Sequence, residues 1–117
     1  KGETHTVADC NHEHQRVMSF IKEAIRPSTA RKMVVVTHHV PSFRMQCPKF
    51  AGSKANGAFM VELEDYIKGC GVDYWIYGHS HYNVDVQIGE TWCVSNQLGY
   101  VFHDEHLTFN PGKTIEV

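Results

Sequence analysis

Histidine is the residue type with the clearest chemical potential in this sequence. Nine of the 117 residues are histidine, and four of them lie in two close groups, His38-His39 and His79-Ser80-His81. Each group directly follows a short apolar run of the kind that forms buried β-strands. Imidazole is a good ligand for transition metals such as Zn, Fe and Ni. The spacing therefore predicts a transition-metal site formed by the two groups.

The apolar runs 33–37 and 72–77 are expected to be strands of an α/β sheet, the first of them buried on both faces. Helical periodicity precedes each run, first between an N-cap at Asn11 and a stop at Pro27, and then over about 56–69. In open α/β sheets, ligands bind beyond the carboxyl ends of the strands. If the two strands are parallel neighbours, the four imidazoles lie within reach of one another. Gly78 would permit a sharp turn after the second strand.

The rest of the chain is expected to complete one layered α/β domain. Residues 84–88 alternate between apolar and polar side chains, residues 89–90 turn into a further strand over 91–95, and a last strand is expected near 107–109. Residues 40–56 have no period and are expected to form a long loop. Trp75 and Trp92 are expected in the core. The run 103–106 (HDEH) is interpreted as a solvated turn.

Composition and charge limit the partners. The 11 Lys+Arg and 13 Asp+Glu residues give a formal charge of −2, which argues against an anionic membrane and against nucleic acid other than a small nucleotide. The longest uncharged stretch, 33–43, is too short to span a bilayer. Cysteines 10, 47, 70 and 93 lack close spacing, so reduced thiols are expected and no zinc ribbon is predicted. Without a secretion signal at its start, the chain is expected to be cytoplasmic.

Three segments, in their order and spacing, give the chain a family resemblance. Residues 34–42 (VVVTHHVPS) resemble the penultimate metal motif of the calcineurin-like metallophosphoesterases, and residues 75–81 (WIYGHSH) resemble their final Gly-His-x-His motif. Residues 95–100 (SNQLGY) are similar to the Asn-x-x-Gly-Tyr segment of bacterial members. The resemblance implies a four-layer α/β sandwich, the metallo-dependent phosphatase fold. Residues 1–117 would then be the C-terminal half of a single domain of this kind.

The same resemblance implies a two-metal site that hydrolyses phosphate mono- or diesters. His38 and His79 would bind one divalent ion and His81 the other, with Mn, Fe, Zn or Ni as the candidates. His39 would orient a ligand or contact the substrate, and Asn96 would contact the substrate. Two ions about 3.5–4 Å apart clamp the phosphate oxygens and lower the pKa of a water molecule.

The first part of the chain departs from the family pattern. The earlier family motifs, Asp-x-His, Gly-Asp-x-x-Asp and Gly-Asn-His-Asp/Glu, supply the bridging carboxylate and most other ligands, and none is cleanly present. Asn11-His12-Glu13 imitates the third, but Cys10 replaces its glycine and the segment is interpreted as a helix start. Three histidines without a carboxylate cannot hold two cations. We therefore expect a fragment that is inactive alone, has partial or no metal occupancy, and self-associates through an exposed sheet edge.

Two other classes of function stay open. A metallo-β-lactamase-like hydrolase also uses His-x-His, but residues 82–84 (YNV) stand where that class would need an aspartate and a further histidine. A non-catalytic module that binds one transition metal, or a partner protein, through its histidines is compatible with the missing carboxylates. The stoichiometry of bound metal would separate a single site from a paired one.

Overall fold

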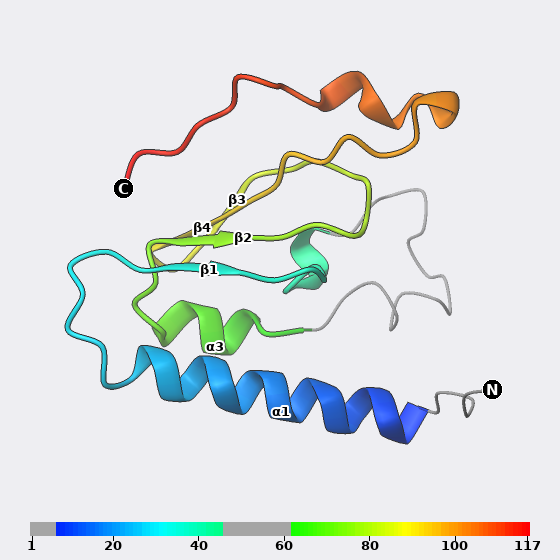
Figure 1. The fold of residues 1–117 in the computed structure, drawn as a ribbon. Coiled ribbons are helices and arrows are strands. Elements are labelled where there is room, and N and C mark those ends of the chain that lie inside the picture. Colours follow the sequence, from blue (N-terminus) through cyan, green and yellow to red (C-terminus); the bar gives the residue numbers. More distant parts are fainter. Residues whose placement is uncertain (1–6, 46–61) are drawn as a thin grey trace. The chain divides into compact units, whose positions relative to one another are not determined.

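The computed structural model describes residues 7–45 and 62–117 and divides the chain into two units, Lys1–Arg31 and Lys32–Val117 (Figure 1). The described part of the first unit is dominated by one helix, α1 (Val7–Ile25), with Asp9 in its first turn and Lys22 in its last. Both charges suit the helix dipole. The helix begins before Asn11, so the expected N-cap there is wrong. No proline or glycine interrupts residues 7–10, and Asp9 stabilises the earlier start.

Four short strands of the second unit form a mixed sheet in the order β1-β2-β4-β3 (Figure 1). They are β1 (Val34–Val36), β2 (Tyr74–Ile76), β3 (Val86–Ile88) and β4 (Thr91–Val94). Strand β2 pairs in parallel with both β1 and β4, whereas β3 pairs antiparallel with β4. The two strands before the histidines are thus parallel neighbours, the condition on which the expected meeting of the imidazoles depends. The predicted hairpin that turns at residues 89–90 is confirmed. The unit is therefore a small mixed α/β domain.

The second helix, α3 (Glu64–Gly69), precedes β2 and is tied to the segment that follows β1. The N–H of Phe43 donates to Oε1 of Glu62 at 3.0 Å, and the N–H of Leu63 donates to the carbonyl of Pro41 at 2.9 Å. A short 3-10 turn, η1 (Phe43–Met45), lies in this segment, and Met45 is fully buried. The helix ends at Gly69, one of the two ends that Gly69 and Gly71 offer in the sequence. Residues 62 and 63 were expected inside it but are not helical, because the backbone of Leu63 bonds to Pro41 instead. Residues 46–56 of the expected loop, and with them the expected start of the helix near residue 56, lie outside the described residues.

Helix α3 packs against the sheet face that carries Trp75. This side chain is fully buried, and the ring of Tyr66 meets it edge-on at 6.5 Å. On the other face, residues 113–116 line a shallow hollow together with Tyr74 and Trp92. Trp92 is 42% exposed, so its expected place in the core is wrong. Among the described residues of this unit, the extended segment 113–116 lines the face on which it stands.

Strand β1 was expected to be buried on both faces, and this is also wrong. Val34 and Val36 are 41% and 70% exposed. The register places them beside Tyr74 and Ile76, on the face opposite Trp75, and β1 is an edge strand. The exposed valines reflect an edge position that a β-branched run alone does not reveal, because edge and central strands can share the same composition.

The expected strand near 107–109 is absent, because this region forms two 3-10 turns, η3 (Val101–His103) and η4 (Glu105–Thr108). Asp104 joins them in the left-handed region, with φ 57°. The backbone groups of this region form local hydrogen bonds, such as the one from the N–H of Phe109 to the carbonyl of His106, in place of bonds to a neighbouring strand. Beyond the turns, Nζ of Lys113 donates to Asp85 and to the carbonyl of Ser95 and holds the C-terminal segment to the sheet.

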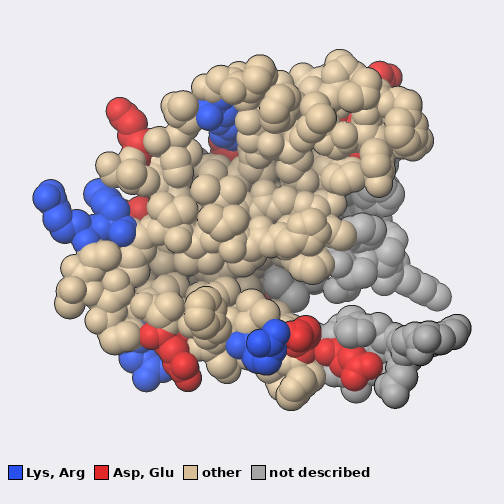
Figure 2. All heavy atoms as spheres, viewed as in Figure 1, with Lys and Arg blue, Asp and Glu red and all other residues tan. Residues whose placement is uncertain are grey.

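Neither a membrane-spanning helix among the described residues nor a basic patch on the face drawn in Figure 2 is present. No helix within residues 7–45 and 62–117 is long and apolar enough to cross a bilayer. On the face drawn in Figure 2, the described Lys and Arg side chains lie singly or near Asp and Glu.

Two of the described cysteines are free thiols, Cys70 half-buried and Cys93 buried. Burial raises the pKa of Cys93 to about 12.

Substitution of Gly89 by alanine is expected to destabilise the domain. Gly89 has φ +61°, and a Cβ there would lie 2.9 Å from the carbonyl oxygen of Lys68 at the end of α3. The left-handed backbone and this contact together are expected to lower the free energy of unfolding by about 1–3 kcal/mol. Urea unfolding would measure it. Gly112→Ala is the matched control, since its nearest contact is an ordinary 3.5 Å. Equal stability of the two variants would contradict the expected role of Gly89.

Candidate metal centre

The backbone pairing of β1 and β2 continues past both strands to the histidines. The N–H of Thr37 donates to the carbonyl of Ile76 at 2.9 Å, and the N–H of Gly78 donates to the carbonyl of His38 at 3.1 Å. These two bonds hold the carboxyl ends of the strands side by side. His38 comes two residues after β1 and His79 three residues after β2, so these bonds bring the two histidines together at this edge of the sheet.

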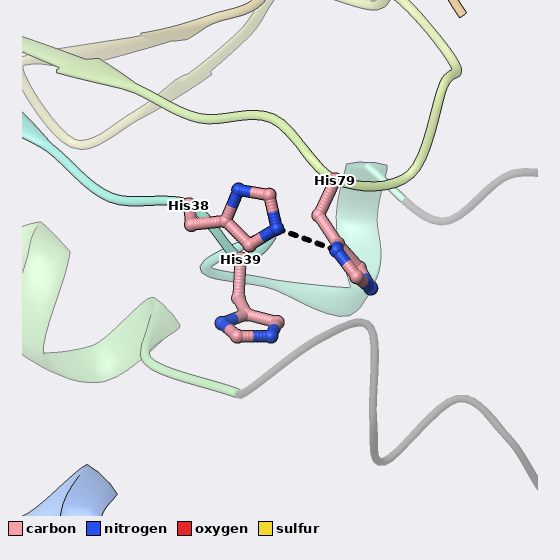
Figure 3. A group of neighbouring side chains, drawn as sticks. All are labelled: His38, His39 and His79. Carbon is pink, nitrogen blue, oxygen red and sulfur yellow. Dashed lines mark hydrogen bonds between the residues drawn. The ribbon is translucent and has the colours of Figure 1, made fainter.

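Three imidazoles gather there, those of His38, His39 and His79 (Figure 3). Nε2 of His38 lies 2.7 Å from Nδ1 of His79, a hydrogen bond between the two rings. The ring of His39 lies 5.0 Å from that of His38 and 4.8 Å from that of His79, measured between centroids. One nitrogen from each of the three rings lies within 4.8 Å of the other two. We call these residues the histidine cluster.

The turn that carries His79 and His81 is made by the histidines themselves. Their φ angles are 70° and 56°, in the left-handed region that non-glycine residues seldom occupy. Gly78 does not have a positive φ, and a Cβ on it would meet only the carbonyl of His38 at 3.6 Å. The sharp turn expected at Gly78 therefore lies one residue later. Strained backbone of this kind concentrates at functional sites.

His81 does not join the histidine cluster. Its Nδ1 lies 2.9 Å from Oε1 of Glu105, and the ring of Tyr100 packs edge-on against it at 4.8 Å. The backbone N–H of His81 donates to Oε1 of Gln97 at 2.6 Å. The expectation that four imidazoles gather is thus met by three, because the left-handed turn and the contact with Glu105 direct the fourth ring elsewhere.

Loss of water around the rings lowers the pKa of two cluster histidines. For His39, this desolvation is the first cause and the charge of His38 the second. For His79, desolvation is again first, followed by the charges of His39, His38 and His81. Both pKa values fall below the ordinary 6.5. These two rings are therefore neutral at neutral pH, which is the form of imidazole that binds a metal ion.

Around His81 the charge is negative instead. The pKa of Glu105 is lowered, first by the hydrogen bond that the N–H of Tyr100 donates to it and also by its contact with His81. Glu105 is therefore a carboxylate at neutral pH. Its Oε1 accepts from Tyr100 at 2.7 Å and lies 2.9 Å from Nδ1 of His81. An ionised carboxylate on the remote nitrogen is the usual partner of a metal-binding histidine.

The donors of the histidine cluster suit one divalent transition metal. Three neutral imidazoles are the protein ligands of many zinc sites, and they also suit Fe and Ni. Among the described residues, the group contains no aspartate or glutamate. A second cation beside the first would need a bridging carboxylate to offset the repulsion between the ions. The cluster as described therefore fits a single ion.

Other residues singled out in the sequence lie in different surroundings. Asn96 exchanges two hydrogen bonds with the backbone of Asn110, at 2.7 and 2.9 Å, which engages both ends of its amide. Its contact with a substrate stays a prediction. Glu13 of the Asn-His-Glu segment lies in α1 and is paired with Arg16 at the same helix surface.

Glu105, the partner of His81, was not predicted from the sequence. The run 103–106 was interpreted as a solvated turn, and His103 and Asp104 are indeed exposed. Glu105, however, turns back toward His81, with its side chain only 20% exposed. No spacing rule links residues so far apart along the chain. The one available signal was chemical, since a metal-binding histidine calls for a carboxylate or carbonyl on its other nitrogen.

Comparison with known proteins finds one distant relative. The chain is 27% identical over 119 aligned residues to an uncharacterized protein of Acanthamoeba polyphaga mimivirus. The alignment covers 96% of this chain and 41% of the viral protein, so the chain spans less than half the length of that relative. No family model matches the sequence. No solved structure matches it.

Removal of one imidazole is expected to raise the pKa of another. In His39→Asn, His79 loses a neighbouring charge and some desolvation, so its pKa should rise toward 6.5 in the metal-free protein. NMR titration of the ring signals would measure this shift. His14→Asn, a change in α1, is the control and should leave His79 unchanged. An unchanged or lower pKa of His79 in His39→Asn would contradict the electrostatic coupling.

The same lowered pKa values set a pH dependence of stability. The unfolded chain binds protons at His39 and His79 below about pH 6.5, whereas the folded chain binds them only at lower pH. The contribution of His39 and His79 to the free energy of unfolding is therefore complete above pH 6.5. It is lost as the pH falls through their folded pKa values, so the free energy of unfolding should decrease with acidification in that window.

Proposed function

We propose that this protein is part of a metal-dependent phosphoesterase of the calcineurin-like kind and that it supplies the histidine ligands of the site. The observation that carries the proposal is the meeting of His38 and His79 at the ends of two parallel strands, with 2.7 Å between Nε2 and Nδ1. His81 follows on the same turn and is backed by a carboxylate. The motifs 34–42 and 75–81, which resemble those of the family, are the segments that build this arrangement.

In this proposal His38 and His79 hold one divalent ion and His81 faces a second. Two such ions, when bound, stabilise the charge of the phosphate oxygens and lower the pKa of a water molecule. The chain itself supplies neutral nitrogen donors, because the pKa values of His39 and His79 lie below the ordinary 6.5. The ring of His39 lies beside those of His38 and His79, near enough to contact a substrate bound to their ion.

The proposed site is completed by carboxylates from outside this chain. The histidine cluster contains none among the described residues, and two cations need at least one to bridge them. The viral relative supports this arrangement, because more than half of its length lies beyond the aligned part. A longer polypeptide would supply the remaining ligands, and the 117 residues would be inactive alone.

A second candidate function is a one-metal binding module. It is favoured by the three cluster nitrogens, which lie within 4.8 Å of one another without any second-metal ligand in the group. In that case His39 is a ligand of the same ion as His38 and His79. The two candidates therefore differ in the roles that they give to His39 and His81.

Metal titration of single variants separates the two candidates. Under both, His38→Ala and His79→Ala should weaken Co²⁺ or Zn²⁺ binding by more than about tenfold, since a ligand matters at least as much as a residue that supports it. In a longer polypeptide that supplies the missing carboxylates, the phosphoesterase proposal expects His81→Ala to lose binding of a second ion and His39→Ala to keep the first. The one-metal module expects His39→Ala to weaken binding of its single ion and His81→Ala to leave that binding unchanged. Calorimetry and the visible spectrum of Co²⁺ would report both, with His12→Ala in α1 as the control.

Hydrolysis is the direct test of the activity. With Mn²⁺, the 117-residue chain should not hydrolyse a chromogenic phosphodiester, whereas a longer polypeptide that contains it and supplies the missing carboxylates should. Reading the coding sequence upstream of Lys1 would show whether those motifs are encoded. Substantial hydrolysis by the chain alone would contradict the expected incompleteness. A longer polypeptide that carries the carboxylates and binds metal without hydrolysing phosphate esters would contradict the activity itself.

A further inference from the structure

The surroundings of His81 are more elaborate than those of the cluster histidines. Its backbone is held in the left-handed region, with φ 56°, and its N–H donates to Oε1 of Gln97 at 2.6 Å. The side chain of Gln97 is itself fixed, since its Nε2 donates to the carbonyl of Tyr82 at 3.0 Å and to Oγ of Ser80 at 3.2 Å. One glutamine thus ties together the three residues 80–82.

The ring of His81 is fixed as firmly as its backbone. One oxygen of Glu105, Oε1, lies 2.9 Å from Nδ1 of the ring and accepts the N–H of Tyr100 at 2.7 Å. The ring of Tyr100 packs edge-on against the imidazole, at an interplanar angle of 86°. The carboxylate therefore cannot leave His81 without breaking its bond to the backbone of the next turn.

Gly99 makes this arrangement possible. Its φ is +68°, and a Cβ there would lie 2.5 Å from Cβ of Glu105 and 3.3 Å from Cβ of His81. Any other residue at position 99 would collide with both members of the pair. The segment 97–105 thus contributes a glutamine for the backbone, a glycine for space and a glutamate for the ring of one histidine.

We propose that Glu105 is a positioning residue that fixes His81 in the form protonated at Nδ1 and unprotonated at Nε2. A carboxylate only accepts, so the hydrogen on the facing nitrogen must belong to the imidazole. Nε2 is then a bare lone pair, ready to bind a cation or to accept a proton. The first use rests on the proposed function, whereas the tautomer does not.

The tautomer of His81 can be read in the metal-free protein by long-range ¹H–¹⁵N correlation NMR, at a pH where the ring is neutral. The wild-type ring should carry its hydrogen on Nδ1. Glu105→Ala should shift it toward Nε2–H, the form that a free histidine side chain prefers. Glu105→Gln should retain Nδ1–H, because an amide oxygen in the place of Oε1 can accept from both His81 and Tyr100. Glu90→Ala, which removes an exposed carboxylate in the β3–β4 turn, is the control.

Gly99→Ala tests the same arrangement with Glu105 still present. The added Cβ should displace the glutamate and change the tautomer as Glu105→Ala does. If Glu105→Ala does not fold, the wild-type and Glu105→Gln spectra still decide the question. A wild-type ring protonated at Nε2, or a tautomer unchanged in a folded Glu105→Ala, would overturn the proposal.

Metal binding is measured separately, so that the two proposals can fail independently. If His81 binds a cation, Glu105→Ala should lower the affinity of that site by about 10–100-fold, and Glu105→Gln by less. In a longer polypeptide that supplies the missing carboxylates, the expected tautomer without any metal binding at His81 would overturn the proposed function and leave the role of Glu105 intact. Metal binding with the opposite tautomer would overturn the role of Glu105 alone.

Discussion

The parallel pairing of β1 with β2 is the constraint on which the candidate site depends. Both strands are short, yet their pairing continues through Thr37 and Ile76 to the bond between Gly78 and His38. Parallel strands end at the same edge of a sheet, so residues that follow them in sequence become neighbours in space. A distance of 41 residues along the chain becomes 2.7 Å between Nε2 of His38 and Nδ1 of His79.

The left-handed turn at residues 79–81 then divides the imidazoles between two environments. His79 points back to His38 and His39, in a group without carboxylates among the described residues, whereas His81 meets Glu105. Each left-handed residue costs of the order of 1 kcal/mol, so the turn persists only because bonds such as that from His81 to Gln97 hold it. The segment 97–105, which orients the ring of His81, thus also supplies the hydrogen bond that stabilises the strained backbone of this residue.

The sequence predicted the parts of this site that depend on local pattern. The apolar runs, the hairpin turn at Gly89 and the end of α3 could be read from composition and glycine positions, and the histidines followed from the strand ends. What it could not predict depends on tertiary position. The exposure of Val36 and Trp92 reflects which face and edge of the sheet is covered, and no periodicity reports the contact between Glu105 and His81.

The charges around the histidine cluster and around His81 both favour a bound cation that can attract an anion. Neutral rings at His39 and His79 leave the full charge of a bound cation available to an anion, because no described carboxylate in the cluster offsets it. At His81 the carboxylate of Glu105 lies behind the ring, so it strengthens Nε2 as a donor without occupying the position of a ligand. In the proposed function, that anion is a phosphate ester, which a partly compensated site would attract. The carboxylates that this proposal places outside the chain would then have to bridge the cations without cancelling that attraction, which limits how many can take part.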